Sequence, residues 1–509
     1  MRRYTKKQIF ELHKTVTATF SVILKLLQLK RSSEAYQIVV DLQQALIEMG
    51  ENIEKEEGIG TGAVKHLEEA CEMLYQCTQS RNPIVSTEYL RKAQGTYAKC
   101  IDSVKNEIPD DKIKIVFLPY KASMWTAMES IWKAAIQDET CEAKVVVIPY
   151  DILGSEGERE KEVYEADKFP DYVPIVDYKE YPLEEEKPDI VIIHNPYDET
   201  NTLTRVPEKY YSYNIKPHTN CLVYSPYHTI GGFVKGATDG FIEPQAALVA
   251  DKVVVQSEFV KQIYLSYGFE TEKILAYGSP KADAIATMGD EWSIPNEWKK
   301  KLEGKKKVFL LNTHWAYFMK GKTNEKNGKR DFAVRFHEEF MQAMEERKEE
   351  VGLIWRPHPL MFDAGNQRAK ECMPYIEALI ERMEQSDFAV VDKTDDYRYA
   401  FYASDAMVTT YSSLLNEYLI TGKPVMIFQT KPTNEAGEAS PIDHRSCYFR
   451  FPKDRGVPFS QFIDMVLKGE DEKYDERMEI LRNKSFANMD GTAGEKIYNH
   501  LIKEMGVQL

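Results

Sequence analysis

Apolar residues recur at helical spacing through the first hundred positions of the chain. One stripe lies within residues 9–27 and a second within residues 38–53, with apolar side chains three or four positions apart. Two further helical patterns follow Gly62 and Pro83, each after residues that favour a turn. The pattern predicts a helical bundle, or a pair of helical hairpins, over residues 1–108.

From residue 109 onward, short apolar runs alternate with helical patterns. The runs are 113–118, 144–148, 190–193, 221–224 and 252–255 in a first set, and 308–311, 352–355, 389–391, 406–408 and 425–427 in a second. Buried parallel strands joined by helices form doubly wound sheets. We therefore predict two α/β domains, residues 109–288 and residues 289–509, that face each other across a cleft.

Composition and charge argue against a nucleic-acid-binding, disulfide-rich or membrane-spanning protein. The formal charge of −15 argues against a nucleic-acid partner, because duplex binding requires a basic surface. The seven cysteines include no CxxC pair, so neither a disulfide framework nor a zinc site is indicated. No run approaches the roughly 20 apolar residues of a membrane span. We expect a cytoplasmic protein without a metal or a cofactor.

Histidines follow several of the predicted strands. Of the ten histidines, four stand directly after an apolar run. They are His194, His228, His314 and His358. Ligands of open α/β sheets bind beyond the carboxyl ends of the strands. A lone histidine is more often structural, but neutral histidine can accept a proton from a hydroxyl and protonated histidine can stabilise a leaving phosphate. Two histidines across a cleft could divide these tasks.

Two segments of the second predicted domain are suited to phosphate. The turn after residues 406–408 contains Thr410, Ser412 and Ser413 and opens a helix, whose free N–H groups and dipole favour an anion. A plain N-cap role for Ser412 is the alternative. Arg356 and His358, on a backbone stiffened by prolines, suit a diphosphate. The Walker, dinucleotide, HExxH and GxSxG motifs are absent.

Three separated motifs give the chain a family resemblance. They are ILAYGSPKAD at 274–283, RPHPLM at 356–361 and YASDAMVTTYSSLLNEYLITGKPVMIF at 402–428. In this order they resemble the CDP-glycerol:poly(glycerophosphate) glycerophosphotransferase family of teichoic-acid primases and polymerases. The resemblance covers about residues 224–428. It implies a GT-B fold, with two Rossmann-like domains and the nucleotide held mainly by the second.

The resemblance also implies roles for individual residues. His228 falls at the family's Trp-His-Gly-Thr motif, whose histidine is taken as the base, and His358 matches the histidine expected near the diphosphate. The substrate-binding residues would be Arg356, Thr410, Ser412, Ser413, Gly278 and Ser279. The chain departs from the family pattern at Thr229, where the family has glycine, and at Thr410, where it commonly has aspartate.

The implied activity is a transfer of glycerol phosphate, or a similar polyol phosphate, from CDP-glycerol or a related CDP-polyol to a hydroxyl, with release of CMP. The acceptor would be a lipid-linked glycan or a polyol-phosphate polymer, which would bring the enzyme to the inner face of the membrane. A GT-B glycosyltransferase using a nucleotide sugar is one alternative. A non-catalytic binding or scaffold protein is another, favoured by the two altered motifs. The helical bundle could also mediate the formation of an oligomer.

Overall fold

The computed structural model describes residues 1–80, 82–154, 156–236, 238–289, 292–314, 317, 329–358, 361, 373–429 and 440–506, without the side chains of residues 4 and 329–332. Two positions of the RPHPLM motif, Pro359 and Leu360, lie outside these residues. The chain forms two compact units. The first comprises residues 1–114 and 139–142, and the second comprises residues 115–138 and 143–509.

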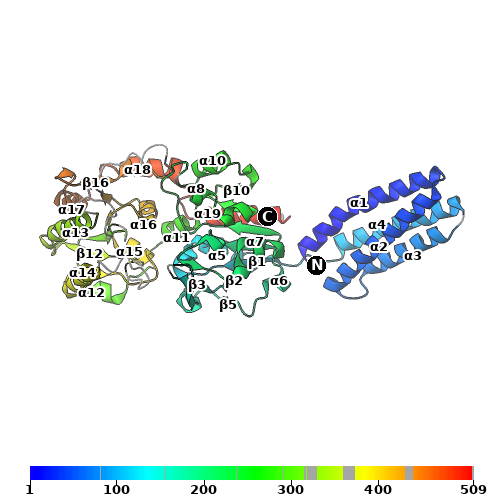
Figure 1. Cartoon of the computed structure of the whole chain (residues 1–509), viewed down its shortest axis with the longest axis horizontal. Coiled ribbons are helices and arrows are strands. Elements are labelled where there is room, and N and C mark those ends of the chain that lie inside the picture. Colours follow the sequence, from blue (N-terminus) through cyan, green and yellow to red (C-terminus); the bar gives the residue numbers. More distant parts are fainter. Residues whose placement is uncertain are drawn as a thin grey trace. The chain divides into compact units, whose positions relative to one another are not determined.

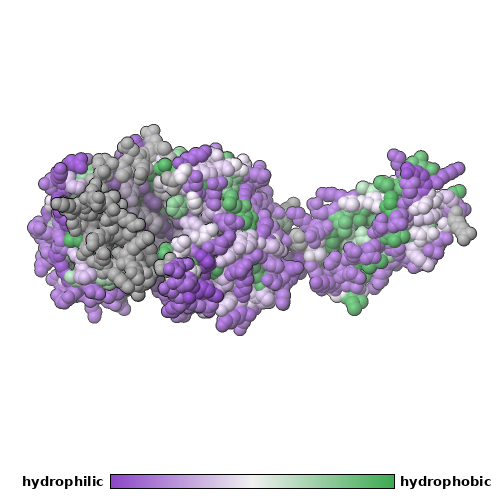
Figure 2. Space-filling model, in the orientation of Figure 1, coloured by the Kyte–Doolittle hydropathy of each residue, from purple (hydrophilic) through white to green (hydrophobic). Residues whose placement is uncertain are grey.

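The first unit is a bundle of four helices, as the apolar stripes predicted (Figure 1). The helices are α1 (Arg3–Gln28), α2 (Ser32–Glu57), α3 (Gly62–Gln79) and α4 (Pro83–Asn106). Thr61 caps α3 by accepting a hydrogen bond from the Val64 N–H at 3.2 Å. The bundle has an apolar core of its own, drawn from residues 1–108. Apolar side chains also reach its surface, among them Val22, Val40 and Ile47 (Figure 2).

The first large sheet has seven strands in the order β10-β9-β8-β6-β1-β2-β5. The strands are β1 (Ile113–Leu118), β2 (Cys141–Val147), β5 (Ile175–Asp177), β6 (Ile190–Ile193), β8 (Cys221–Tyr224), β9 (Lys252–Val254) and β10 (Ile274–Leu275). The pairs β1/β6, β6/β8, β8/β9, β9/β10 and β2/β5 are parallel. A small antiparallel sheet accompanies it, made of β3 (Tyr150–Leu153), β4 (Arg159–Val163) and β7 (Thr204–Arg205).

The second large sheet has seven strands in the order β13-β12-β11-β14-β15-β16-β17. The strands are β11 (Lys307–Asn312), β12 (Val351–Trp355), β13 (Ala389–Val391), β14 (Ala406–Thr409), β15 (Val425–Phe428), β16 (Tyr448–Phe451) and β17 (Arg455–Gly456). All neighbours are parallel except β16 and β17. β11 and β14 lie side by side at the centre, so their carboxyl ends meet at one edge of the sheet.

Helices cover and connect the strands of the second unit. They are α5 (Glu129–Gln137), α6 (Leu183–Glu186), α7 (Ser212–Ile215), α8 (Asp239–Ile242), α9 (Gln245–Val249), α10 (Glu258–Ser266), α11 (Pro280–Ala286), α12 (Asn296–Leu302), α13 (Lys329–Glu345), α14 (Met373–Gln385), α15 (Arg398–Ala403), α16 (Ser413–Tyr418), α17 (Phe459–Lys468), α18 (Tyr474–Ile480) and α19 (Ala493–Glu504). None of the helices in the described part of the chain is both long and apolar enough to cross a membrane.

The last helix returns to the first large sheet. α19 packs against α5 and α11, and it lies among the elements of that sheet (Figure 1). Asp283 on α11 accepts hydrogen bonds from the Ala493 and Gly494 N–H groups at 3.1 and 2.6 Å, so its carboxylate caps α19. A side chain at Gly494 would lie 2.2 Å from Ser130 Oγ on α5. The predicted division between residues 288 and 289 stays a prediction, and α19 crosses it.

Candidate active site

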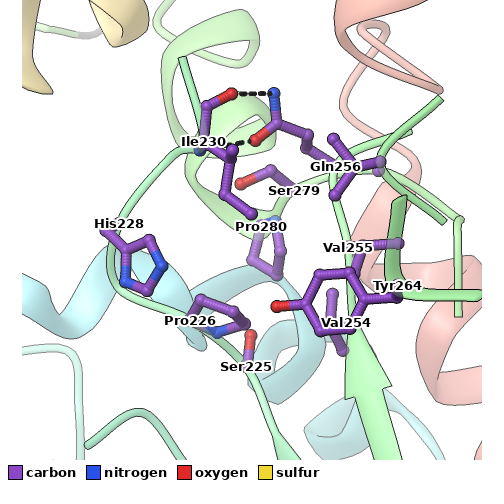
Figure 3. A pocket seen from close by; sticks show the side chains of 12 residues that line it. Ser225, Pro226, His228, Ile230, Val254, Val255, Gln256, Tyr264, Ser279 and Pro280 are labelled. Atoms are coloured by element: carbon purple, nitrogen blue, oxygen red, sulfur yellow. Dashed lines mark hydrogen bonds between the residues drawn. The ribbon is translucent and has the colours of Figure 1, made fainter. Parts of the chain in front are cut away.

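His228 lies on a loop that follows β8 and is held from both sides. Ser225 begins the loop, and its Oγ donates to the Ala127 carbonyl at 2.6 Å. Gln256 pairs with both backbone groups of Ile230, accepting from the N–H at 2.9 Å and donating to the carbonyl at 3.3 Å (Figure 3). These bonds fix the loop backbone on either side of the imidazole, so His228 occupies a preformed position.

A small pocket brings together three of the residues that the sequence singled out. His228, Gly278 and Ser279 all line it, although 50 positions separate the histidine from the glycine (Figure 3). The parallel strands β8, β9 and β10 explain the proximity, because their carboxyl ends lie at the same edge. The pocket is also lined by the hydroxyl-bearing Ser225 and Tyr264.

The environment of His228 keeps its imidazole uncharged. Neither ring nitrogen makes a hydrogen bond of good geometry to another described residue, and the nearby backbone of Phe241 has only a small, opposing effect on the pKa of the ring. Burial, together with the positive charge of Lys281, lowers the pKa of His228 to about 4. A neutral imidazole with an unbonded nitrogen can accept a proton at neutral pH. The site therefore provides a hydrogen-bond acceptor at the carboxyl edge of the first sheet.

Gly278 has a structural task in addition to lining the pocket, whereas none is seen within the described residues for the side chain of Ser279. Gly278 has a φ of +106°, and a Cβ there would lie 2.3 Å from the carbonyl oxygen of Ala487. The segment that leads to α19 passes so close to this position that no side chain fits, so glycine is required. Ser279 precedes α11 as its N-cap, but its side chain makes no capping hydrogen bond.

The second group of predicted site residues surrounds the start of α16. Ser412 is the N-cap of this helix, and its Oγ accepts from the Leu415 N–H at 3.3 Å. The same hydroxyl donates to Asn312 Oδ1 at 3.1 Å, and Asn312 Nδ2 donates to the Arg356 carbonyl at 2.8 Å. Asn312, at the end of β11, therefore ties together the ends of three neighbouring strands. Ser413 is exposed.

Thr410 and Arg356 are both engaged by protein partners. Thr410 is fully buried, and its Oγ1 accepts from the His314 N–H at 3.0 Å. Arg356 Nη1 donates to Asp392 Oδ2 at 2.5 Å and to the Thr394 carbonyl at 3.0 Å. Asp392 is buried, so this ion pair joins the ends of β12 and β13. The diphosphate role predicted for Arg356 stays a prediction.

Two histidines lie side by side beyond β11 and β12. The ring centroids of His314 and His358 are 5.2 Å apart, with the rings at 64° to each other. Burial, together with the neighbouring His314, lowers the pKa of His358 to about 4. An anion bound beside the two rings would favour their protonated forms and offset this effect. The two imidazoles at this edge of the second sheet would therefore become stronger hydrogen-bond donors beside a bound anion.

His194 has a different role from His228. Its side chain is buried, and Nε2 accepts a hydrogen bond from the Tyr120 N–H at 3.1 Å. Burial lowers the pKa of His194 to about 3. This histidine supports the backbone between β1 and the following turn. Within the described residues, no group of three or more histidine, cysteine or carboxylate side chains is arranged to hold a metal ion.

The fold and the two strand edges define a two-domain α/β protein of the GT-B type. Among solved structures, a UDP-N-acetylglucosamine 2-epimerase matches with a TM-score of 0.50 and 15% identity, over 78% of this chain and 97% of the other. The wall teichoic acid polymerase TagF matches with a TM-score of 0.50 and 13% identity, over 86% of this chain and 98% of the other. At these identities the two matches support the fold alone.

Sequence comparison identifies the family. Residues 235–503 match the model of the CDP-glycerol:poly(glycerophosphate) glycerophosphotransferase family, and the chain belongs to this family. A teichoic acid poly(ribitol-phosphate) polymerase of Bacillus spizizenii is 23% identical over 265 residues. That match covers 49% of this chain but only 37% of the relative. The chain thus spans well under half the length of this curated relative.

Proposed function

We propose that the protein transfers glycerol phosphate, or a similar polyol phosphate, from a CDP-activated donor to a hydroxyl acceptor and releases CMP. The observation that carries this proposal is the neutral, unbonded imidazole of His228 in a chain of this family. The acceptor oxygen attacks the phosphorus that carries the polyol, His228 accepts the hydroxyl proton, and the bond from that phosphorus to CMP breaks.

The donor phosphates would bind at the carboxyl edge of the second sheet. His314 and His358 lie together there, and Ser412 lies at the start of α16. Imidazolium and N–H groups directed at a diphosphate offset the charge that develops on the departing CMP. Because Arg356 is held by Asp392, the two histidines would supply the cationic contacts, once the bound diphosphate has favoured their protonated forms.

Two aspects of the proposed substrates, the polyol of the donor and the nature of the acceptor, rest on the family match and not on the geometry of the site. The relative named for poly(ribitol phosphate) makes CDP-ribitol a candidate donor beside CDP-glycerol. A lipid-linked glycan or a polyol-phosphate chain as acceptor would place the reaction at the inner face of the membrane. The helical bundle, with its separate core, would then serve attachment or assembly rather than chemistry.

A donor panel tests the proposal directly. The protein is incubated with CDP-glycerol, CDP-ribitol or UDP-N-acetylglucosamine and a glycerol-phosphate acceptor, and release of CMP or UDP is followed. CMP release that depends on acceptor is expected, and it should fall about 10²- to 10⁴-fold in His228→Ala. His218→Ala, a histidine outside the pocket, is the matched control. Release of UDP alone would favour a glycosyltransferase, and no turnover would favour a binding protein.

A further inference from the structure

A buried lysine connects the His228 loop to the helix that begins beside Ser412. Lys281 lies on α11 and is 7% exposed. Its Nζ donates to the Tyr227 carbonyl at 2.7 Å and to Glu417 Oε1 at 2.5 Å. Tyr227 directly precedes His228, and Glu417 lies on α16. One ammonium group therefore bonds to the backbone of one candidate site and to the helix of the other.

We propose that Lys281 is a positioning residue for the transfer, which holds the acceptor-activating loop and the donor-binding helix at one fixed spacing. This inference rests on the proposed function, because it assigns the two ends of the bridge to the two substrates. A buried ammonium and a buried carboxylate are costly to desolvate, and an apolar pair of similar size would often stabilise the fold as well. The charged pair at this position therefore requires a reason other than stability.

A second contact between the same two segments supports this role. A Cβ on Gly231, in the His228 loop, would lie 2.3 Å from Asn416 Nδ2 on α16. The Gly231 carbonyl also accepts from the Ile442 N–H at 3.1 Å, and Asn416 Oδ1 lies 3.0 Å from His444 Nε2. Backbone and side chains of the loop and of α16 are thus in direct contact. A change in one segment is transmitted to the other over a short path.

The lysine also acts on His228 through its charge. The groups around them are Glu417 and Tyr397 from the second domain, Tyr227 on the loop itself and Tyr264 from α10. Among these groups Lys281 is the one whose charge lowers the pKa of the imidazole, beside the larger effect of burial. Removing the ammonium should therefore raise the pKa of His228, while a residue that only fills space would leave it unchanged.

The test replaces both partners so that no unpaired charge remains buried. Lys281→Met/Glu417→Gln removes the bridge and keeps the side-chain volumes similar. We expect nearly unchanged CDP-glycerol affinity by calorimetry, a single-turnover rate lowered roughly 10²-fold, and an acid limb of the pH–rate profile shifted to higher pH. The control is Lys252→Met/Glu504→Gln, a Lys–Glu pair of the same 2.5 Å length away from the pocket, which should change neither rate nor profile.

A second variant covers the case in which the double variant does not fold. Glu417→Gln alone keeps the bond from Lys281 to the Tyr227 carbonyl but breaks the bond to α16. It should also lower turnover, while the acid limb stays in place or moves to lower pH, because the ammonium loses its compensating charge. Wild-type turnover with an unchanged profile in either variant would overturn the proposal.

One measurement does not depend on the transfer reaction. Carbon-13 labelling of histidine Cε1 allows the onset of the His228 titration to be followed by NMR over the pH range in which the protein stays folded, with the signal assigned by its loss in His228→Gln. A raised pKa in Lys281→Met/Glu417→Gln, with none in the control pair, supports the coupling even if the wild type uses no CDP-polyol. An unshifted titration overturns the coupling. Absence of CDP-polyol turnover in the wild type instead counts against the proposed function alone.

Discussion

Glu129 and Arg398 form an ion pair, with 2.8 Å between Oε2 and Nη1, although 269 positions separate them in the chain. Both side chains are at least 95% buried, on α5 and α15 respectively. Lys133 contacts the same carboxylate, and Asp396 contacts the same guanidinium. Burial alone would raise the pKa of Glu129, but Arg398 and Lys133 together lower it. The pair joins the first α/β region to the second independently of Lys281.

The first prediction concerns this pair. Arg398→Met leaves the Glu129 carboxylate buried with only Lys133 as a cationic partner, so it should destabilise the protein by about 3 kcal/mol. The measurement is thermal unfolding by calorimetry. Arg382→Met is the control, since Arg382 pairs with Glu338 and Glu345 at the surface and should cost less than about 1 kcal/mol. Equal losses of stability in the two variants would show that the buried pair contributes no more than a surface pair.

A second prediction separates backbone strain from packing at two glycines. Gly268 has a φ of +91° with open space around it, whereas Gly278 has a φ of +106° and faces the Ala487 carbonyl. Gly268→Ala should cost about 1–2 kcal/mol from the backbone alone. Gly278→Ala adds a steric clash and should cost about 3 kcal/mol or more. Similar melting temperatures for the two variants would contradict the close packing at Gly278.

A third prediction concerns acid sensitivity. Burial lowers the pKa of five histidines, to about 3 or about 4: His194, His228, His337, His358 and His444. In the unfolded chain they titrate near 6.5. The unfolded state therefore binds more protons between these values, and the free energy of unfolding should fall as the pH drops from about 6.5 to about 4. Each histidine contributes up to about 1.4 kcal/mol per pH unit.

Calorimetric melting temperatures at pH 7, 6 and 5 check this expectation. Asp198 acts in the opposite direction, because burial raises its pKa to about 6, so the stability it contributes is lost as the pH rises through that value. Burial raises the pKa of Asp283 as well, and these two carboxyl groups offset only part of the effect of five histidines. His337→Gln, which can retain a hydrogen bond to Thr313, should make the pH dependence shallower. A melting temperature that does not change over this range would be inconsistent with neutral buried imidazoles.

A fourth prediction distinguishes donor binding from acceptor activation. His358→Ala and Ser412→Ala should weaken CDP-polyol binding as well as turnover, because contacts with phosphate exist in both the ground and the transition state. His228→Ala should lower the single-turnover rate while donor affinity stays nearly constant. Thr61→Ala, which removes an N-cap in the helical bundle, controls for the loss of the Ser412 cap. Strong loss of donor affinity in His228→Ala would show that His228 binds the donor and would contradict its assignment to acceptor activation.

The fifth prediction concerns the helical bundle. Its core is drawn from residues 1–108, and the core around the first large sheet begins at Val116. A shortened chain that starts at Asp110 should therefore keep its calorimetric affinity for CDP-glycerol. We expect the shortened chain to lose solubility, assembly or membrane attachment instead. If the shortened chain is folded by circular dichroism but binds no donor, the bundle belongs to the donor site.

Much of the fold could be predicted from apolar runs. All ten strands predicted from sequence are present, because buried parallel strands give continuous apolar stretches such as 190–193. The small sheet was missed, since β4 is almost entirely exposed and carries no apolar pattern. The return of α19 was also missed, because its amphipathic pattern shows that one face is buried but not which partner buries it.

The sequence predicted where the candidate residues lie relative to the strands but not their contacts, and their roles stay predictions. His228 and His358 could be found because each follows an apolar run, and Ser412 because it precedes a helical pattern. The bond between Arg356 and Asp392 was not foreseen, since neighbouring strand ends meet only in the folded sheet. Lys281 lies within the ILAYGSPKAD motif, but the sequence does not indicate that its side chain is buried, because lysines in helical patterns are usually solvated.

The position of α19 has a consequence for biosynthesis. The bond from the Tyr498 hydroxyl on α19 to Asp138, at the end of α5, spans 360 positions, so the helix that covers α5 is made long after α5 itself. While the second region is being translated, the surface of α5 that α19 will bury is open to solvent and to chaperones. The first α/β region can complete its fold only after α19 has emerged from the ribosome. Truncations that remove α19 should therefore destabilise first the part of the protein that was synthesised earlier.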